Sequence, residues 1–215
     1  MEFRALQAQI NPHFLYNSLE SILWMAEAGK KEDIITITKS LSNFYRISLS
    51  KGDYKISIRN EIAHVENYLI IQKLRYRDIL SYRIEVPQVL YQYAIIKLVL
   101  QPIVENALYH GIKNRRDMGS LLITGREEPD AIVLEVSDNG MGMDADQIQG
   151  IEQMLNIPIT SNTLSTSYGL RNIHQRLKLE YGEGMGIFIK SERSVGTVVS
   201  IRIAKEPYLV QSSTH

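Results

Sequence analysis

Helical periodicity dominates the first fifty residues and is the strongest constraint on the fold. Residues 2–28 contain no glycine, and residues 31–50 repeat apolar side chains at helical spacing, with only Gly29 and Lys30 between the two segments. Those apolar side chains are Ile34, Ile37, Leu41, Phe44, Tyr45 and Ile47. So short a connection predicts an antiparallel helical hairpin. Because an isolated hairpin buries little surface, we expect a second copy of the chain to complete a four-helix bundle.

Residues 51–53 (Lys-Gly-Asp) interrupt the pattern and mark an expected domain boundary. We assign residues 1–52 to the hairpin, 53–208 to a second domain and 209–215 to a frayed tail. In the second domain we expect strands at 54–58, 80–86, 121–126, 131–136, 186–190 and 197–203, and helices at 59–78, 93–111 and 169–181. Residues 143–167 are polar and are expected to form an irregular flap. The pattern predicts an α+β chain, in which the hairpin precedes an α/β sandwich with helices on one face of a mixed sheet.

Composition excludes several classes of function. The 24 basic and 24 acidic residues balance, so there is no electrostatic reason to expect nucleic acid or an anionic membrane as a partner. The absence of cysteine excludes disulfides and thiolate chemistry, and is compatible with a reducing cytoplasm. No apolar run approaches the roughly 20 residues that span a bilayer. The first residues resemble the middle of a longer helix, so we expect an input region to be missing before Met1.

His13 is the candidate nucleophile of the hairpin. On a helical wheel Asn17 and Glu20 lie within about 40° of it. The opposite side, which we expect to pack, carries Leu15, Leu19, Ile22 and Ala26. Pro12 either kinks the helix or restarts it at the first helical position. A good share of an imidazole with an unperturbed pKa near 6.5 is neutral and nucleophilic at pH 7. The alternative is a solvated histidine without a role.

One stripe of the helix expected at 93–111 is polar. Asn106, Tyr109, His110 and Lys113 follow one another at i, i+3, i+4 and i+7. The amide oxygen of Asn106 is a suitable Mg²⁺ ligand when ATP phosphates and waters supply the others, and His110 and Lys113 would face phosphate oxygens. A polar helix edge at the surface explains these residues equally well. The chain has no P-loop sequence.

Two glycine-containing segments complete a possible nucleotide pocket. Asp138 would accept a hydrogen bond from the adenine amino group, while Gly140 and Gly142 allow the backbone to approach the base. An ordinary Asp-Asn-Gly turn is the alternative.

The second segment opens the helix expected at 169–181. Gly169, Leu170 and Asn172 lie in its first turn, where free N–H groups would bind the triphosphate. Arg171 or Arg176 would add positive charge there. The Thr197 hydroxyl is a candidate partner at the Asp138 end of the pocket.

The ordered set of motifs resembles bacterial sensor histidine kinases of the lytic-regulator sensor branch. Gln-Ile-Asn-Pro-His-Phe-Leu-Tyr-Asn-Ser-Leu at 9–19 is similar to their phosphoacceptor box, and Gln-Pro-Ile-Val-Glu-Asn-Ala at 101–107, with His-Gly at 110–111, to their N box. Residues 138–142 and 169–177 resemble the first two glycine boxes, and Gly-Thr at 196–197 the last. The resemblance covers about residues 6–203.

The resemblance implies an ATP-dependent protein histidine kinase. The hairpin would be the dimerisation and phosphotransfer domain of a homodimer, followed by a Bergerat-type ATP-binding domain. His13 would be phosphorylated, Asn106 would bind Mg²⁺, and Asp138 would bind adenine. Family members are typically membrane-anchored and pass the phosphoryl group to an aspartate of a response regulator. We therefore expect the cytoplasmic portion of a bacterial inner-membrane sensor.

The chain departs from the family pattern at two places. Ser-Thr-Ser-Tyr at 165–168 stands where the second glycine box usually carries another glycine, and Phe14 stands where many histidine kinases place an acidic general base. If a base is needed, Glu20, or Asn17 as an orienting residue, is nearest on the same helix face.

Two alternatives to the kinase stay open. One is a degenerate dimeric module that binds nucleotide without turnover. The other is an ATPase related to gyrase-type or chaperone enzymes, which use a glutamate one turn before the asparagine as the water-activating base. Here that position is Pro102, and we expect Glu105 to point elsewhere.

Overall fold

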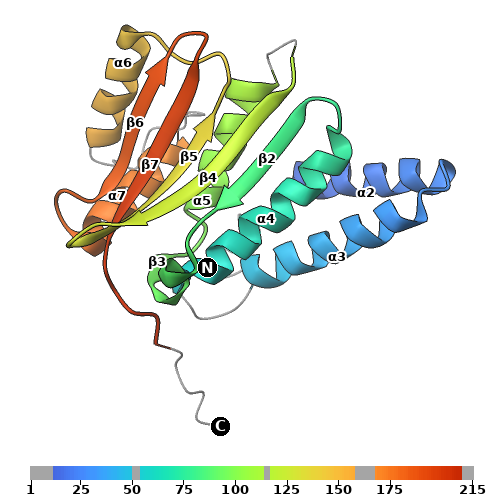
Figure 1. Cartoon of the computed structure of the whole chain (residues 1–215), viewed down its shortest axis with the longest axis horizontal. Helices are drawn as coiled ribbons and strands as arrows, with labels where there is room; N and C mark the ends of the chain where they lie inside the picture. Colours follow the sequence, from blue (N-terminus) through green and yellow to red (C-terminus); the bar gives the residue numbers. More distant parts are fainter. Residues whose placement is uncertain (1–11, 50–53, 114–116, 158–167, 210–215) are drawn as a thin grey trace.

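The computed structural model describes residues 12–49, 54–113, 117–157 and 168–209. The expected boundary at 51–53 and most of the expected tail lie outside these residues, so both stay predictions. The predicted hairpin is confirmed: α2 (Pro12–Glu27) and α3 (Lys31–Ser48) lie antiparallel (Figure 1). Gly29 makes the turn at a φ of +67°, a conformation that favours glycine. Within the described residues no helix is both long and apolar enough to cross a membrane.

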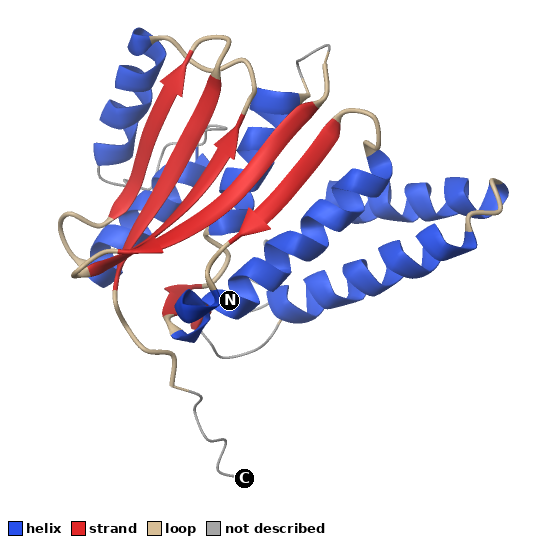
Figure 2. Ribbon diagram, in the orientation of Figure 1, coloured by secondary structure: helices blue, strands red, loops and turns tan. Residues whose placement is uncertain are grey.

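Residues 80–204 contain a five-stranded mixed sheet (Figure 2). Its order is β2 (Leu80–Glu85), β4 (Gly119–Glu127), β5 (Ala131–Asp138), β7 (Gly196–Ala204) and β6 (Gly186–Glu192). β2 and β4 are parallel, and the other neighbours are antiparallel. A separate two-stranded ribbon pairs β1 (Lys55–Ser57) with β3 (Ala94–Ile96).

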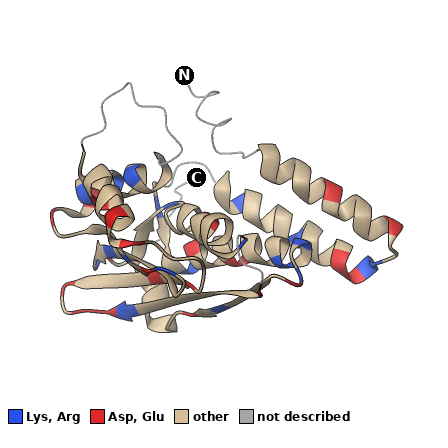
Figure 3. Ribbon diagram, turned by 90° about the horizontal axis from the view of Figure 1, so that it is seen from above, with Lys and Arg blue, Asp and Glu red and all other residues tan. Residues whose placement is uncertain are grey.

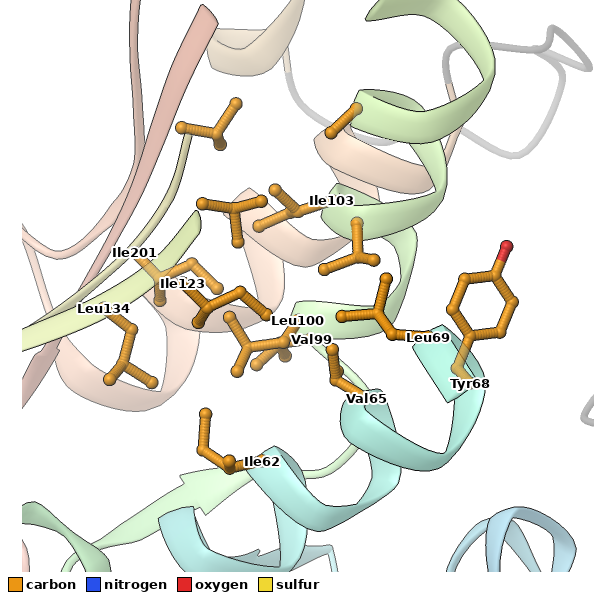
Figure 4. Close-up of a cluster of buried hydrophobic side chains, with 14 of the residues drawn as sticks. Ile62, Val65, Tyr68, Leu69, Val99, Leu100, Ile103, Ile123, Leu134 and Ile201 are labelled. Carbon is orange, nitrogen blue, oxygen red and sulfur yellow. The ribbon is translucent and has the colours of Figure 1, made fainter. Parts of the chain in front are cut away.

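The remaining helices lie on one face of the sheet, as predicted (Figure 3). They are α4 (Ile58–Arg75), α5 (Leu100–Asn106), the π-helical turn η2 (Ala107–Ile112), α6 (Ala145–Asn156) and α7 (Tyr168–Tyr181), with a short 3₁₀ turn η1 (Gln88–Gln92) after β2. Side chains of α4, the start of α5 and the sheet interdigitate to form the core (Figure 4). Its labelled members include Ile62, Val65, Leu69, Leu100, Ile103, Ile123, Leu134 and Ile201.

The hairpin packs against α4 of the same chain. Phe14 and Phe44 are buried there with Tyr68, and the Ser48 hydroxyl lies 2.8 Å from the His64 Nε2 atom. The packing face that we predicted for α2 is therefore wrong in part. Phe14, Ser18 and Met25 are buried, whereas Leu19 and Ala26 are exposed. Phe14 faces inward, where its ring packs against Phe44 of α3 and Tyr68 of α4.

Two predicted elements are also wrong. The helix expected at 93–111 begins only at Leu100, because residues 94–96 pair with β1 as a strand. The flap expected at 143–167 contains α6, which begins at a capping box between Asp144 and Gln147. Residues 158–167 of that segment lie outside the described residues.

Candidate nucleotide-binding site

A pocket of about 430 Å³ opens between the helical layer and the end of the sheet. Seven of the expected nucleotide-binding residues line it: Asn106, His110, Asp138, Gly142, Gly169, Leu170 and Thr197. They come from α5, η2, the end of β5 and the loop after it, the start of α7, and β7. Segments distant in sequence therefore meet where the resemblance places a nucleotide.

Asp138 is the buried charge of this pocket. It ends β5 opposite Thr197 of β7, and its side chain is only 8% exposed. Burial raises the pKa of its carboxyl group, and hydrogen bonds from the Gly140 and Thr197 backbone act in the opposite direction. The Gly140 N–H donates to Asp138 Oδ1 over 2.8 Å. A buried carboxylate held in this way is a directional acceptor for a ligand amino group.

Glycine is required around Asp138 because the backbone approaches it closely. A Cβ atom on Gly111 would lie 2.6 Å from Asp138 Oδ1, and one on Gly140 would lie 2.4 Å from the Gly111 Cα atom. Gly142 has a φ of +61°, and a Cβ atom there would lie 1.9 Å from the Glu192 carbonyl oxygen. Gly140 thus contacts the Asp138 carboxylate but does not line the pocket.

The Thr197 hydroxyl lies 2.8 Å from Ser191 Oγ. The Ser191 hydroxyl also donates to the Gly196 carbonyl over 2.8 Å, and the Met143 N–H donates to Ser191 Oγ over 2.9 Å. This network ties the edge of the pocket at β6 and β7 to the segment that leads into α6.

The helix that carries Asn106 differs from its predicted course. After Asn106 the chain widens into the π-helical turn η2, a feature that is frequent at functional sites. Glu105 lines the pocket beside Asn106, so our prediction that it points elsewhere is wrong. Burial raises the pKa of the Glu105 carboxyl group, and a hydrogen bond from Gln101 Nε2 (2.9 Å) lowers it.

Lys113 does not line the pocket. Its Nζ atom donates to the Tyr76 hydroxyl over 2.8 Å and lies 3.8 Å from the centre of the Tyr109 ring. The prediction that Lys113 faces the same site as Asn106 is wrong, because the wider π-helical turn rotates it off the α-helical stripe.

Only part of the first turn of α7 lines the pocket. Gly169 and Leu170 line the pocket, whereas Asn172 is exposed and lies outside the lining. Arg171 donates from Nε to the Ile157 carbonyl over 3.1 Å, after the end of α6. Arg176 donates to the Lys97 carbonyl over 3.3 Å. Residues 165–167, which replace the family's usual glycine, lie outside the described residues.

Sequence reasoning missed the apolar wall of the pocket. Met143, Ile151 and Met154 come from the segment that we expected to be irregular. The signal that identifies α6 is its Asp144-x-x-Gln147 capping box, in which the Gln147 N–H donates to Asp144 and the Gln147 side chain accepts from the Asp144 N–H.

His13 lies on the exposed side of α2, as predicted. Asn17 Nδ2 lies 3.1 Å from His13 Nδ1 and 3.2 Å from His13 Nε2, so the amide lies against the ring. Glu20 is exposed and, with Trp24, lines a separate groove between the hairpin and the end of α4. The candidate nucleophile and the pocket thus belong to different parts of the fold.

Comparison with known sequences follows the same division. Residues 94–207, more than half of the chain, match the profile described as histidine kinase-, DNA gyrase B- and HSP90-like ATPase. The chain belongs to this family. Residues 1–80, which include the hairpin and α4, match the histidine kinase profile.

Two curated relatives of this chain are sensor histidine kinases. The chain is 34% identical to the sensor histidine kinase YesM of Bacillus subtilis (strain 168) over 202 residues, covering 94% of this chain and 33% of YesM. It is 32% identical to the sensor histidine kinase BtsS of Escherichia coli (strain K12), also covering 94% of this chain and 33% of the relative. The chain thus spans about a third of the length of these relatives.

A solved structure supports the fold. The catalytic domain of histidine kinase ThkA superposes with a TM-score of 0.51 at 15% identity, covering 72% of this chain and 97% of that domain.

Proposed function

We propose that this chain is the kinase portion of a two-component sensor: it transfers a phosphoryl group from ATP to His13, from which the group passes to an aspartate of a response-regulator receiver domain. The observation that carries the proposal is the pocket in which Asn106 and the buried Asp138 converge, in a chain that also presents an exposed histidine on a hairpin. Its similarity to sensor histidine kinases supports this reaction over simple ATP hydrolysis.

Asp138 would bind the adenine of ATP. Its carboxylate can accept from the exocyclic amino group. The absence of side chains at Gly111 and Gly140 leaves room for the carboxylate, and the Gly140 N–H holds it. The pocket walls from Met143, Ile151 and Met154 suit the faces of a planar base.

The donor set suits Mg²⁺ bound together with phosphate. Within the described residues no group of three or more histidine, aspartate or glutamate side chains could hold a metal ion. Magnesium is commonly bound through few protein ligands, with phosphates and waters completing its octahedron. We assign Asn106 as the protein ligand, and the ion would neutralise charge on the transferred phosphoryl group. His110, Gly142, Gly169, Leu170 and Thr197 complete the lining that holds the nucleotide.

His13 would attack the γ-phosphorus through a neutral ring nitrogen. The nitrogen–phosphorus bond forms as the bond from phosphorus to the β,γ-bridging oxygen breaks, and ADP leaves. The other ring nitrogen then releases its proton. Asn17 orients the ring through its contact, and Glu20 stays a predicted proton acceptor. Phosphoryl transfer depends chiefly on positioning and charge stabilisation, so the apolar Phe14 after His13 is compatible with it.

Homodimerisation would bring the phosphoacceptor hairpins of two chains together. α2 exposes Tyr16, Leu19, Leu23 and Trp24, and α3 exposes Ile35. Glu20 and Glu27 are the only charged residues of α2, and the rest of its ribbon in Figure 3 is tan. Exposed apolar surface of this kind suits a four-helix bundle formed by two hairpins.

We also assign the chain to the lytic-regulator sensor branch, with a Bergerat-type domain. This assignment rests on the motif at 9–19 and the glycine boxes. In this proposal the chain is the cytoplasmic portion of a bacterial inner-membrane sensor, attached to the membrane through a preceding sensor region. The partners are a receiver domain and a second copy of the chain, with no nucleic acid.

Incubation with γ-labelled ATP and Mg²⁺ tests the proposal. Wild type should acquire acid-labile, base-stable label, and His13→Gln should acquire none while binding Mg-ATP with unchanged affinity. Transfer of the label to a receiver domain would complete the test. ATP binding without label on wild type would favour the degenerate signalling module instead. Steady hydrolysis that persists in His13→Gln would favour the gyrase-like ATPase.

A further inference from the structure

Glu61 is a buried carboxylate that the proposed reaction does not use. It lies on α4, its side chain has no exposed surface, and it accepts three backbone hydrogen bonds from residues far along the chain. The Leu98 N–H donates to Oε2 over 3.0 Å, and the N–H groups of Val99 and Leu100 donate to Oε1 over 2.8 Å each.

These three donors lie at the start of α5. The first N–H groups of a helix have no partner within the helix, and the residue before α5, Val99, supplies no side-chain cap. Glu61 fills that role from another helix. Burial raises the pKa of its carboxyl group, whereas the three N–H donors and the charge of Arg176 lower it.

The corner before α5 is conformationally costly. Leu98 has a φ of +60°, in the left-handed region that non-glycine residues rarely adopt. Such a backbone persists when its surroundings over-determine it. Three contacts hold this corner. Glu61 of α4 binds the three N–H groups. Arg176 of α7 donates to the Lys97 carbonyl, and the Lys97 N–H donates to the Tyr54 carbonyl over 3.0 Å.

The helix that directly follows this corner carries pocket side chains. α5 runs from Leu100 to Asn106 without interruption, a rise of roughly 9 Å. A displacement of its first turn therefore reaches Glu105 and Asn106, which line the pocket. Asp138 belongs to another element, β5, where the Gly140 N–H and the pairing with β7 hold it.

We propose that Glu61 is a positioning residue of the nucleotide site: by capping α5 from α4 it sets the place of Asn106 and so the magnesium-dependent part of ATP binding. The inference rests on the proposed function, in which Asn106 binds Mg²⁺ and Asp138 binds adenine. A carboxylate that only stabilised the fold would support both ends of the pocket equally. A positioning residue affects the phosphate end and leaves the adenine end in place.

The test measures ADP affinity by calorimetry with Mg²⁺ and with EDTA, so that the gain in affinity due to magnesium is obtained for each protein. In Glu61→Gln an amide N–H group replaces one carboxylate oxygen and faces the N–H donors of α5. We expect the magnesium-dependent gain to fall at least about tenfold, with metal-free affinity changed less than about threefold. Amide hydrogen exchange at Leu98, Val99 and Leu100 should accelerate in the same variant.

Two further variants make the result decisive. Ser57→Ala removes the N-cap hydrogen bond to the Asn60 N–H (3.2 Å) at the start of the same helix, and should weaken α4 without altering the magnesium-dependent gain. Glu61→Asp keeps the charge but shortens the reach, and should lose the gain as Glu61→Gln does. If Glu61→Gln does not fold, Glu61→Asp is measured in its place.

The outcomes distinguish a failure of the role proposed for Glu61 from a failure of the function proposed for the pocket. An unchanged gain in the Glu61 variants, or an equal loss of metal-free and magnesium-dependent binding, would overturn the positioning role. If wild type shows no gain from magnesium, the proposed function of the pocket fails first.

Discussion

The ring of Phe14, the residue after His13, packs against the ring of Tyr68 on α4, with centroids 5.2 Å apart and planes inclined by 32°. Phe14 also packs against Phe44 of α3 at 5.0 Å. The residue that follows the phosphoacceptor candidate is therefore anchored on α4. Because Glu61 of the same helix caps α5, α4 contacts both the hairpin and the helix that carries Asn106.

Replacing Phe14 by alanine should destabilise the chain strongly. The ring is 5% exposed and fills the space between Phe44 and Tyr68, so its removal leaves a cavity. We expect a loss of about 3–5 kcal/mol in the free energy of unfolding, measured by urea titration. Leu179→Ala is the control, because Leu179 is 87% exposed and its change should stay within about 0.5 kcal/mol. Equal effects of the two variants would contradict the packing.

Acidification should weaken the contact between α3 and α4 through His64. Burial, and secondarily the charge of Lys97, lowers the pKa of His64 from 6.5 to about 3. Above pH 6.5 the ring is neutral in both states, and its full contribution to stability is present. As the pH falls toward 3, the unfolded chain gains a proton that the folded ring does not bind, so stability is lost by up to about 1.4 kcal/mol per pH unit.

The variant His64→Gln isolates this effect. Its free energy of unfolding should fall less than that of wild type between pH 6.5 and 4.5, because the remaining titrating groups are common to both proteins. Parallel pH profiles would show that His64 titrates normally in the folded state.

Local patterns predicted the elements whose conformation is set by near neighbours. The hairpin follows from helical spacing around Gly29, and Asp138 was identified because its turn follows a β-branched strand. Ile95 and Ile96 were assigned to a helix because apolar residues continue on both sides. Their pairing with β1 as strand residues is a tertiary effect, which local periodicity does not contain.

Sequence reasoning misplaced or missed several site residues because local patterns do not contain tertiary contacts. Lys113 was placed by assuming an α-helical repeat that the π-helical turn interrupts. The role of Glu61 depends on N–H groups 37–39 residues away, so nothing near it in the sequence marks it as a cap. Met143 and Ile151 belong to a polar segment whose capping box, rather than its periodicity, reveals the helix.

Alanine at Gly140 should weaken nucleotide binding. Its Cβ atom would lie 2.4 Å from the Gly111 Cα atom and 2.5 Å from Asp138 Oδ1, so the carboxylate has to move. Calorimetry should show at least about tenfold weaker ATP binding, since a hydrogen bond to a charged group contributes roughly 1.5–3 kcal/mol.

Gly150 provides the matched control, because a Cβ atom there meets nothing within 4 Å. It lies within α6, where alanine is a better helix former than glycine by about 0.5–1 kcal/mol. Gly150→Ala should therefore raise the melting temperature and leave ATP affinity unchanged. Retained binding in Gly140→Ala would contradict the role assigned to Asp138.

A charge on the exposed face of α2 should prevent dimerisation. Leu23 and Trp24 are 63% and 73% exposed in the single chain, and the proposed four-helix bundle would bury this face. Leu23→Asp would place a carboxylate inside that bundle at a cost of several kcal/mol. Sedimentation equilibrium should therefore show wild type as a dimer and Leu23→Asp as a monomer at micromolar concentration. Leu179→Asp adds the same charge at an exposed leucine of α7 and should remain dimeric. If Leu23→Asp dimerises as tightly as wild type, the contact between subunits lies elsewhere, and the exposed apolar residues of α2 need another explanation.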